Sequence, residues 1–205
     1  MSISIVLRTD GSRNIFRDAI ISALGSKCLD EALLCSGFFQ DNFKKSAYKV
    51  SDERSLARVC AASGIALTTV GIHNSTWKPA YKNFRDNMNA AGVSIKCMYK
   101  NGMRWHAKVF IGSKNGNPIF GIVGSSNMTR NAFSTGAKFN NECDVFIWDR
   151  RSPIASLGDM IAERLGDQIV IRAPYVPRMN DGLSVSQTLG RIQSEVLGSD
   201  LQELI

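Results

Sequence analysis

A histidine and a lysine at positions 106 and 108 have the types and the spacing needed for phosphoryl chemistry. Side chains two positions apart on a strand point to the same face, so His106 and Lys108 would present a nucleophile and a fixed positive charge together. A short apolar segment later, Gly124-Ser125-Ser126-Asn127 adds a hydroxyl and a carboxamide. A nucleophile, a cation and neutral hydrogen-bond donors are together able to attack a phosphodiester without a metal ion.

These two motifs resemble the signature of the phospholipase D superfamily, H-x-K-x4-D followed by G-S-x-N. His106-x-Lys108 and Gly124-Ser125-x-Asn127 match it in the same order. The aspartate position of the signature holds Ser113, where many bacterial nucleases of the superfamily also vary, so this departure counts mainly against the lipase branch. The segment 141–148 is similar to the strand on which the superfamily carries a carboxylate that orients the histidine.

The resemblance implies four catalytic residues, namely His106, Lys108, Asn127 and Glu142. The histidine would form a covalent phosphohistidine intermediate, and the lysine and asparagine would stabilise the charge of the transition state. The glutamate would hydrogen-bond the imidazole and hold its tautomer. Asp144 lies two positions further along the same strand and competes with Glu142 for this role. The resemblance implies no metal and no cofactor.

A superfamily site requires two H-x-K motifs, and this chain contains one. Its other histidine, His73, is followed two positions later by Ser75 instead of lysine. We therefore expect a homodimer in which each chain contributes His106, Lys108 and Asn127 to one active site on the twofold axis. One imidazole would attack in its neutral form and the other would protonate the leaving group, which a reference pKa of about 6.5 permits near neutral pH.

The elements that must position these residues alternate in the first half of the chain. Helical spacing predicts helices at 13–24, 52–62 and 76–91, and apolar runs predict strands at 31–39, 65–72 and 93–99. This alternation is typical of βαβ units, so we expect an α/β fold with a mixed, mostly parallel central sheet flanked by helices, as in phospholipase D. Three closely spaced strands would carry the motifs, at 105–112, 118–123 and 142–148, with a hairpin loop at 113–117 between the first two.

The composition favours one folded domain with an extension. The chain has 205 residues, of which 44% are hydrophobic, enough for a single core. We expect a catalytic domain over residues 1–173 and a C-terminal extension over 174–205, a candidate contact for an oligomer or a partner. The sequence shows no long apolar run and no leader, and its five cysteines lack C-x-x-C spacing, so we expect a cytoplasmic protein with reduced thiols and no membrane contact.

Positive charge is concentrated in the segment that carries the motifs. Residues 76–151 hold 12 Lys and Arg against 4 Asp and Glu, whereas the whole chain has a net charge of +7. Such clustering attracts polyanions, although a solvated basic surface would show the same pattern. Lys78, Lys82 and Arg104 are the candidates for substrate binding outside the motifs, and Ser125 of the second motif either donates to phosphate or closes the turn.

The sequence therefore predicts a metal-independent phosphodiesterase, a hydrolase of ester bonds, that acts on nucleic acid as a DNA endonuclease. No DNA-reading motif is visible, so the chain is also a candidate nuclease subunit of a restriction or anti-phage system, with targeting or motor activity in another protein. A phospholipid or cardiolipin hydrolase is one alternative, against which Ser113 and the basic segment count. An inactive phospholipase D-like binding module is another, against which the intact His106 and Lys108 count.

Overall fold

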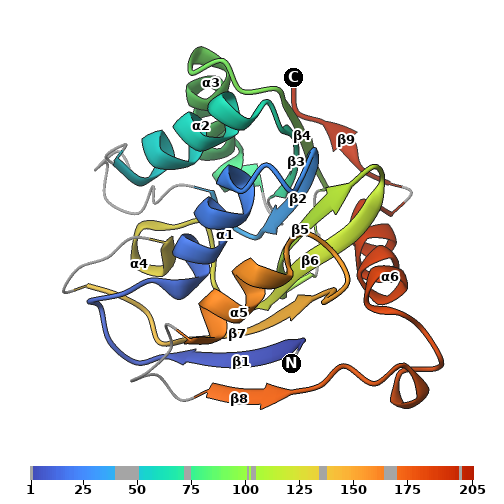
Figure 1. Cartoon of the computed structure of the whole chain (residues 1–205). Coiled ribbons are helices and arrows are strands. Elements are labelled where there is room, and N and C mark those ends of the chain that lie inside the picture. The colour runs from blue at the N-terminus through green and yellow to red at the C-terminus, as the bar shows by residue number, and fades with distance from the viewer. Residues whose placement is uncertain are drawn as a thin grey trace.

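The computed structural model describes residues 2–39, 51–71, 75–100, 102, 105–133, 138–163, 170–198 and 200–205. Within them, nine strands form one sheet in the order β8-β1-β7-β6-β5-β2-β3-β4-β9 (Figure 1). The strands are β1 (Ile3–Arg8), β2 (Glu31–Ser36), β3 (Ala66–Gly71), β4 (Ile95–Tyr99), β5 (Lys108–Lys114), β6 (Asn117–Gly124), β7 (Glu142–Trp148), β8 (Val170–Ala173) and β9 (Gln202–Glu203). The three strands that carry the motifs, β5, β6 and β7, are therefore neighbours inside the sheet.

The expectation of a mostly parallel sheet is wrong, because this sheet is mostly antiparallel. Among the described strands, β2, β3 and β4 pair in parallel, and the other six pairings are antiparallel. The alternation of strands and helices does produce these two parallel pairs, since a crossover helix returns the chain to the same end of the sheet. From β5 onward the chain reverses direction between neighbouring strands. The mixed α/β sheet flanked by helices is confirmed.

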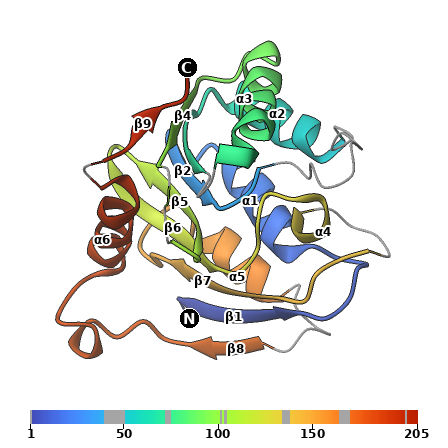
Figure 2. The same ribbon diagram turned by 180° about the vertical axis from the view of Figure 1, so that it is seen from behind.

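Helices cover the two faces of the sheet unequally. One face carries α1 (Ile15–Gly25), α2 (Ser51–Ser63), α3 (Lys78–Ala90), α4 (Arg130–Phe133) and α5 (Ala155–Glu163), and the other carries α6 (Val185–Leu197), as Figures 1 and 2 show from opposite sides. Two short 3-10 turns complete the described elements, η1 (Ser75–Trp77) and η2 (Pro177–Met179). None of the described helices combines the length and the apolar character needed to cross a membrane.

Each face of the sheet has its own apolar cluster. The larger cluster lies under α1 to α5 and includes Phe110 and Phe146, which are fully buried. The smaller cluster lies under α6 and includes Val109 and Ile111. Alternate residues of β5 thus face opposite sides, as the pleat of a strand requires. Lys108, two positions before Phe110, belongs to the side of the larger cluster.

A two-residue turn joins β5 to β6 and sets the register of the two motif strands. Asn115 and Gly116 have φ angles of 50° and 73°. Two consecutive positive φ angles are the mark of a type I′ turn, which asparagine followed by glycine adopts with little strain. The turn lies inside the predicted loop at 113–117, and the hairpin it closes pairs Lys108 with Gly124.

The described part of residues 174–205 returns to the sheet. α6 begins with a capping box, in which the Ser184 hydroxyl accepts from the Gln187 amide and the Gln187 side chain accepts from the Ser184 amide. Leu189 of α6 is fully buried. β9 pairs with β4, and the Leu204 amide donates to the Cys97 carbonyl at 2.8 Å. A contact of this segment with a partner protein stays a prediction.

Candidate active site

The two motifs and the acidic strand β7 meet along one edge of the sheet, namely the edge formed by the first residues of β5 and β7 and the last residue of β6. Lys108 of β5 pairs with Gly124 of β6, and Gly124 pairs with Asp144 of β7. Adjacent strands lie about 4.7–4.9 Å apart, so this row brings three separate sequence segments within side-chain reach. β5 and β7 begin near this row and β6 ends at it. The other predicted site residues lie just beyond this row in the chain and so gather at the same edge. They are His106 before β5, Ser125 and Asn127 after β6, and Glu142 at the start of β7.

The histidine and the lysine of the first motif are both accessible from this edge. His106 is exposed, two residues before β5, and Lys108 is half-buried as the first residue of β5. Lys108 also lies near Cys35 of β2: burial raises the pKa of the Cys35 thiol to about 12, and the lysine charge opposes this rise. An exposed imidazole beside a half-buried ammonium group can meet a phosphate that arrives from solvent. His73 and Arg104 lie outside the described residues.

The glycine of the second motif is required by close packing against β7. A side chain at Gly124 would collide with the Asp144 carboxylate, and its Cβ would lie 2.5 Å from the Cys143 carbonyl oxygen. Such a distance is too short for a carbon atom beside a backbone oxygen. Glycine at this position therefore allows the turn that follows β6 to start directly beside β7.

Asp144 of β7 binds this turn through hydrogen bonds to Ser126. Its side chain is buried, and its carboxylate accepts hydrogen bonds from the Ser126 hydroxyl at 2.6 Å and from the Ser126 amide at 3.3 Å. Burial raises the pKa of Asp144 to about 6, and the two hydrogen bonds from Ser126 partly oppose this rise. The residue between the serine and the asparagine of the G-S-x-N motif is thereby fixed to β7.

Glu142 holds the other serine of the turn. Its side chain is buried at the start of β7, and its carboxylate accepts a hydrogen bond from the Ser125 hydroxyl and one from Asn140 Nδ2 at 3.1 Å. The Ser125 oxygen in turn accepts from the Cys143 amide at 3.0 Å. The structure thus gives Ser125 a turn-closing contact. A carboxylate offers about four acceptor positions, so Glu142 retains capacity for a further donor.

Ser36, the last residue of β2, supports Asn127 and was missed by the sequence reasoning. Its hydroxyl oxygen accepts from the Met128 amide at 3.0 Å and lies 3.3 Å from Asn127 Oδ1 and 2.6 Å from the Phe38 carbonyl oxygen. The hydroxyl proton serves one of these two acceptors at a time. Because 91 residues separate Ser36 from Asn127, no local pattern links them. A polar residue that ends a buried strand was the one available signal.

Arg8 is a second residue that the sequence reasoning missed. Its side chain is buried at 4% exposure, and Nη1 donates to the carbonyl oxygens of Asn131 at 3.3 Å and Ala132 at 3.1 Å. These bonds tie β1 to α4, the helix that follows the second motif. Arg8 also pairs with Glu142 in the sheet. Burial lowers the pKa of Arg8, and the negative charge of Glu142 is the strongest of the effects that oppose this lowering.

The two described basic candidates outside the motifs lie on α3. Lys78 begins this helix, with Nζ 2.9 Å from the Tyr99 hydroxyl and 4.3 Å from the centre of its ring. α3 follows the end of β3, where Gly71 pairs with Ser36, so Lys78 starts near the edge that carries the motifs. Lys82 lies one turn further along the helix. Substrate contact stays a prediction for both lysines.

Comparisons with known proteins bear on the family and the fold of the chain. A family model described as the NgoFVII restriction endonuclease N-terminal PLD domain matches residues 18–147. Among solved structures, the phospholipase D family member Nuc from Salmonella typhimurium is similar with a TM-score of 0.50 and 18% identity, over 84% of this chain and 99% of that chain. Yeast tyrosyl-DNA phosphodiesterase has a TM-score of 0.46 and 12% identity, over 73% of this chain and 47% of that chain. No curated protein matches the chain.

The family model covers more than half of the chain. The matched residues 18–147 include both motifs and β7 as far as Ile147. The likeness to Nuc extends over nearly all of that protein and shows the same fold. The resemblance inferred from the two motifs is therefore confirmed. The chain belongs to the phospholipase D superfamily, in the family of the NgoFVII restriction endonuclease N-terminal domain.

Proposed function

We propose that the protein is a metal-independent phosphodiesterase that cleaves nucleic acid, with DNA as its substrate. The observation that carries this proposal is the single row Lys108, Gly124 and Asp144 across three adjacent strands, which gathers both motifs at one edge. The matched family takes its name from a restriction endonuclease, which supports DNA as the substrate. The basic segment 76–151 includes this edge and would attract a polyanion.

In the proposed reaction, an imidazole nitrogen of His106 attacks phosphorus and the bond from phosphorus to the leaving oxygen breaks. A second imidazole gives its proton to that oxygen. Water then attacks the phosphohistidine, and the second imidazole takes a proton from the water, which restores both histidines. Lys108 and Asn127 would stabilise the negative charge on the non-bridging oxygens throughout.

Glu142 is the better candidate for orienting His106. Both carboxylates are buried and each accepts two hydrogen bonds, but Glu142 is the first residue of β7 and so lies closer to the open end of that strand. In this role it would hold the imidazole tautomer and favour the charged form after attack. Ser125 and Asn140 would then keep the Glu142 carboxylate in place.

The second histidine would come from a second copy of the chain. Each copy supplies one H-x-K motif, so a twofold axis near His106 would place two imidazoles on opposite sides of one phosphate. Mixing His106→Ala subunits with wild-type subunits tests this sharing. If subunits exchange freely in an equal mixture, about one quarter of the dimers keep both histidines, and activity should fall to about that fraction. A fall to one half would contradict a shared site.

The central experiment is digestion of labelled duplex and single-stranded DNA and RNA in the presence of EDTA. We expect wild-type protein to cleave DNA, and His106→Ala and Lys108→Ala to be inactive. Lys114→Ala is the matched control, because Lys114 lies at the opposite end of the same strand. Headgroup release from phospholipid vesicles without DNA cleavage would favour a lipid hydrolase. DNA binding without cleavage or phosphohistidine formation would indicate an inactive binding module.

The family name also supports a role in a restriction or anti-phage system, in which another subunit supplies targeting. On this proposal the isolated protein cuts DNA without an extended recognition sequence. Sequencing the ends of the digestion products measures that preference, and a strict recognition sequence in the isolated chain would contradict the need for a targeting subunit.

A further inference from the structure

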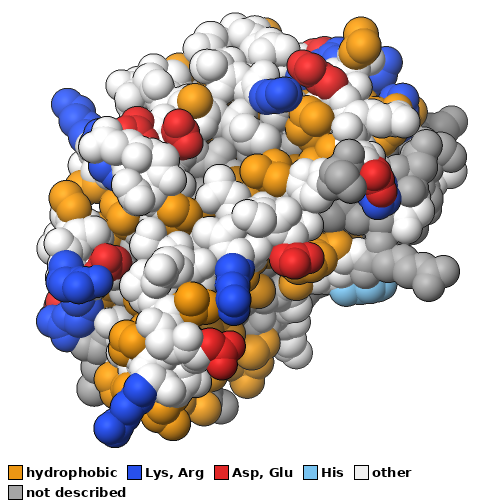
Figure 3. Space-filling view, turned by 90° about the vertical axis from the view of Figure 1, so that its right-hand side faces the viewer, with side chains coloured by type: hydrophobic (Ala, Val, Ile, Leu, Met, Phe, Trp, Pro, Cys, Tyr) orange, Lys and Arg blue, Asp and Glu red, His pale blue; other side chains and the backbone are white. Residues whose placement is uncertain are grey.

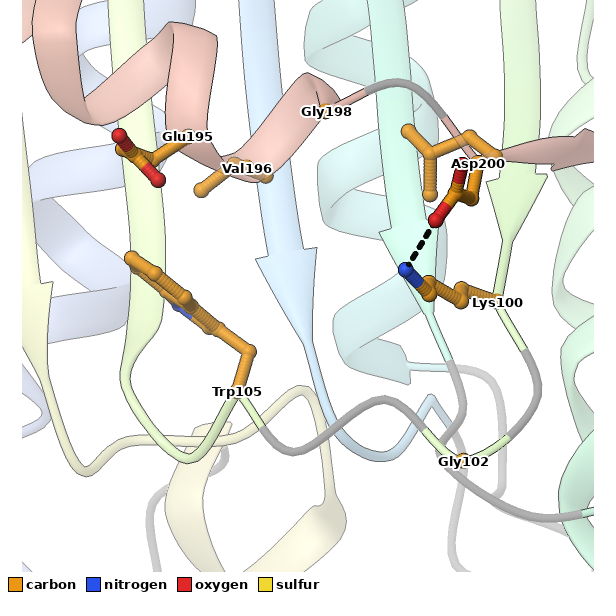
Figure 4. A pocket seen from close by; sticks show the side chains of 8 residues that line it. Lys100, Gly102, Trp105, Glu195, Val196, Gly198 and Asp200 are labelled. Carbon is orange, nitrogen blue, oxygen red and sulfur yellow. Dashed lines mark hydrogen bonds and ion pairs between the residues drawn. The ribbon is translucent and has the colours of Figure 1, made fainter.

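A pocket lies beside Trp105, the residue that precedes His106. Its volume is about 450 Å³, within the range of about 300–1,000 Å³ that small-ligand sites occupy. One wall comes from the connection between β4 and β5, and the other from the end of α6 and the segment leading to β9. The lining residues are Lys100, Gly102, Trp105, Glu195, Val196, Gly198, Asp200 and Leu201. Figure 4 shows Trp105 and Glu195 on one side and Lys100 with Asp200 on the other.

Trp105 gives the pocket an aromatic wall. The ring is half-buried and packs in part against the smaller apolar cluster, on the face of the sheet that carries α6. Its indole N–H is buried and has no acceptor among the described residues. Unpaired buried N–H groups are rare, and packing alone would be served equally well by a ring without one. The part of the ring that lines the pocket is a carbon surface, which is suited to stacking.

The charged groups of the pocket disfavour an anion. Lys100 Nζ lies 2.8 Å from the Asp200 carboxylate, so its positive charge is compensated. The Glu195 side chain is exposed and makes no ion pair or hydrogen bond with the part of the chain that the structure describes. The pocket therefore carries an unpaired negative charge, which repels phosphate but accepts hydrogen bonds from a neutral ring with amino groups. Figure 3 shows both signs of charge on this side of the molecule, with a histidine at its margin.

We propose that this pocket receives the nucleobase next to the scissile phosphate, with the base stacked on Trp105 and its exocyclic amino group donating to Glu195. The inference rests on the proposed function, because the phosphate at His106 brings the base within reach. Lys100 follows Tyr99, which lies in one row with Gly71 and Ser36, so the pocket opens at the same end of the sheet as His106, and one sugar joins a base to its phosphate. Cytosine, adenine and guanine carry such amino groups and thymine does not, so the pocket discriminates against thymine beside the cut.

Binding in a His106→Ala background tests the pocket without cleavage. The probes are fluorescent oligo(dC), oligo(dA), oligo(dT) and an abasic oligomer of the same length, measured by anisotropy at fixed salt in EDTA. Adding Trp105→Ala should weaken binding of oligo(dC) and oligo(dA) by about 5- to 150-fold and leave the abasic oligomer unchanged. Trp105→Phe should restore most of the loss, because phenylalanine keeps the stacking surface.

Glu195→Gln tests the amino contact independently and lies on an exposed helix position, so it should not disturb folding. It should lower the preference for oligo(dC) and oligo(dA) over oligo(dT) by about 5-fold or more. Glu163→Gln, an exposed glutamate on α5, is the matched control and should leave the preference unchanged. If Trp105→Ala fails to fold, Glu195→Gln and Trp105→Phe still decide the question.

Two results would contradict the proposal that this pocket binds a nucleobase. One is an equal loss for abasic and base-bearing oligomers on Trp105→Ala, which would assign Trp105 to the fold or to phosphate contact. The other is an unchanged base preference in Glu195→Gln, which would leave the pocket to another occupant such as a protein segment. Cleavage of DNA by the wild-type protein, which retains His106, is measured separately in EDTA. Base-dependent binding without cleavage would contradict the proposed function alone, and cleavage without base dependence would contradict the pocket alone.

Discussion

The buried carboxylate of Asp144 should lower folding stability at neutral pH, and its protonation in mild acid should remove this effect. Its pKa is raised from the ordinary value of 3.8 to about 6, so the folded chain binds this proton more tightly than the unfolded chain. The resulting stabilisation is fully present below about pH 4 and is lost as the pH rises through about 6. The difference between 3.8 and about 6 corresponds to about 3 kcal/mol of unfolding free energy.

Asp144→Asn removes this pH dependence while preserving the shape of the side chain. Asparagine keeps an acceptor for the Ser126 amide, and the Ser126 hydroxyl can rotate to accept from its Nδ2. The unfolding free energy of the variant should exceed that of wild type by up to about 3 kcal/mol at pH 8, and the difference should vanish near pH 4.

Urea unfolding followed by tryptophan fluorescence across this pH range measures the effect, with the difference between the two proteins isolating the one carboxylate. Asp159→Asn serves as the control, because Asp159 is a partly exposed aspartate on α5. Parallel stability curves for wild type and Asp144→Asn would refute the reasoning, since the carboxylate would then titrate alike in both states.

Three further substitutions test how the site is held together. Ser36→Ala removes the acceptor of the Met128 amide, so it should lower stability by about 1–3 kcal/mol and slow DNA cleavage about tenfold or more; unchanged kcat would remove Ser36 from the site. Gly124→Ala forces a side chain against Asp144 and should cost about 1–3 kcal/mol or more, measured by thermal unfolding; an unchanged Tm would mean that β6 and β7 can separate freely. Arg8→Met leaves the Asn131 and Ala132 carbonyl groups without their donor and should destabilise the fold by about 1–3 kcal/mol or more in urea; a neutral effect would show that the buried charge is dispensable.

Local pattern predicted most of the elements around the site. The resemblance to the acidic strand of the superfamily predicted β7 with the bounds that the structure has, and the polar segment 113–117 predicted the hairpin loop between the motif strands. Strand direction was wrong, because local pattern records which segments are strands and not how distant segments pair. β1 was not predicted, although Ile3–Arg8 alternates between half-buried and buried residues. Its place between β7 and β8 depends on segments more than 130 residues away.

The site was predictable only where chemistry and spacing coincide. The histidine, the lysine and the asparagine stand in short motifs, so their types and order were enough to single them out. The supporting contacts of Ser36 and Arg8 join segments 91 and 124 residues apart, and neither residue has a reactive group that marks it. The pairing of Ser126 with Asp144 likewise depends on a strand register that the sequence does not display.

The placement of β8 and β9 has a consequence for how the molecule assembles. Both strands come from residues 170–205, yet they occupy opposite borders of the sheet, and α6 between them packs against β6 on one face. During synthesis, β5, β6 and β7 leave the ribosome before β8, α6 and β9, so both borders of the sheet are then still unpaired. Unpaired strand borders invite association with other chains. Such distant pairings also slow folding, so we expect the nascent chain to be prone to association until β8 and β9 have docked.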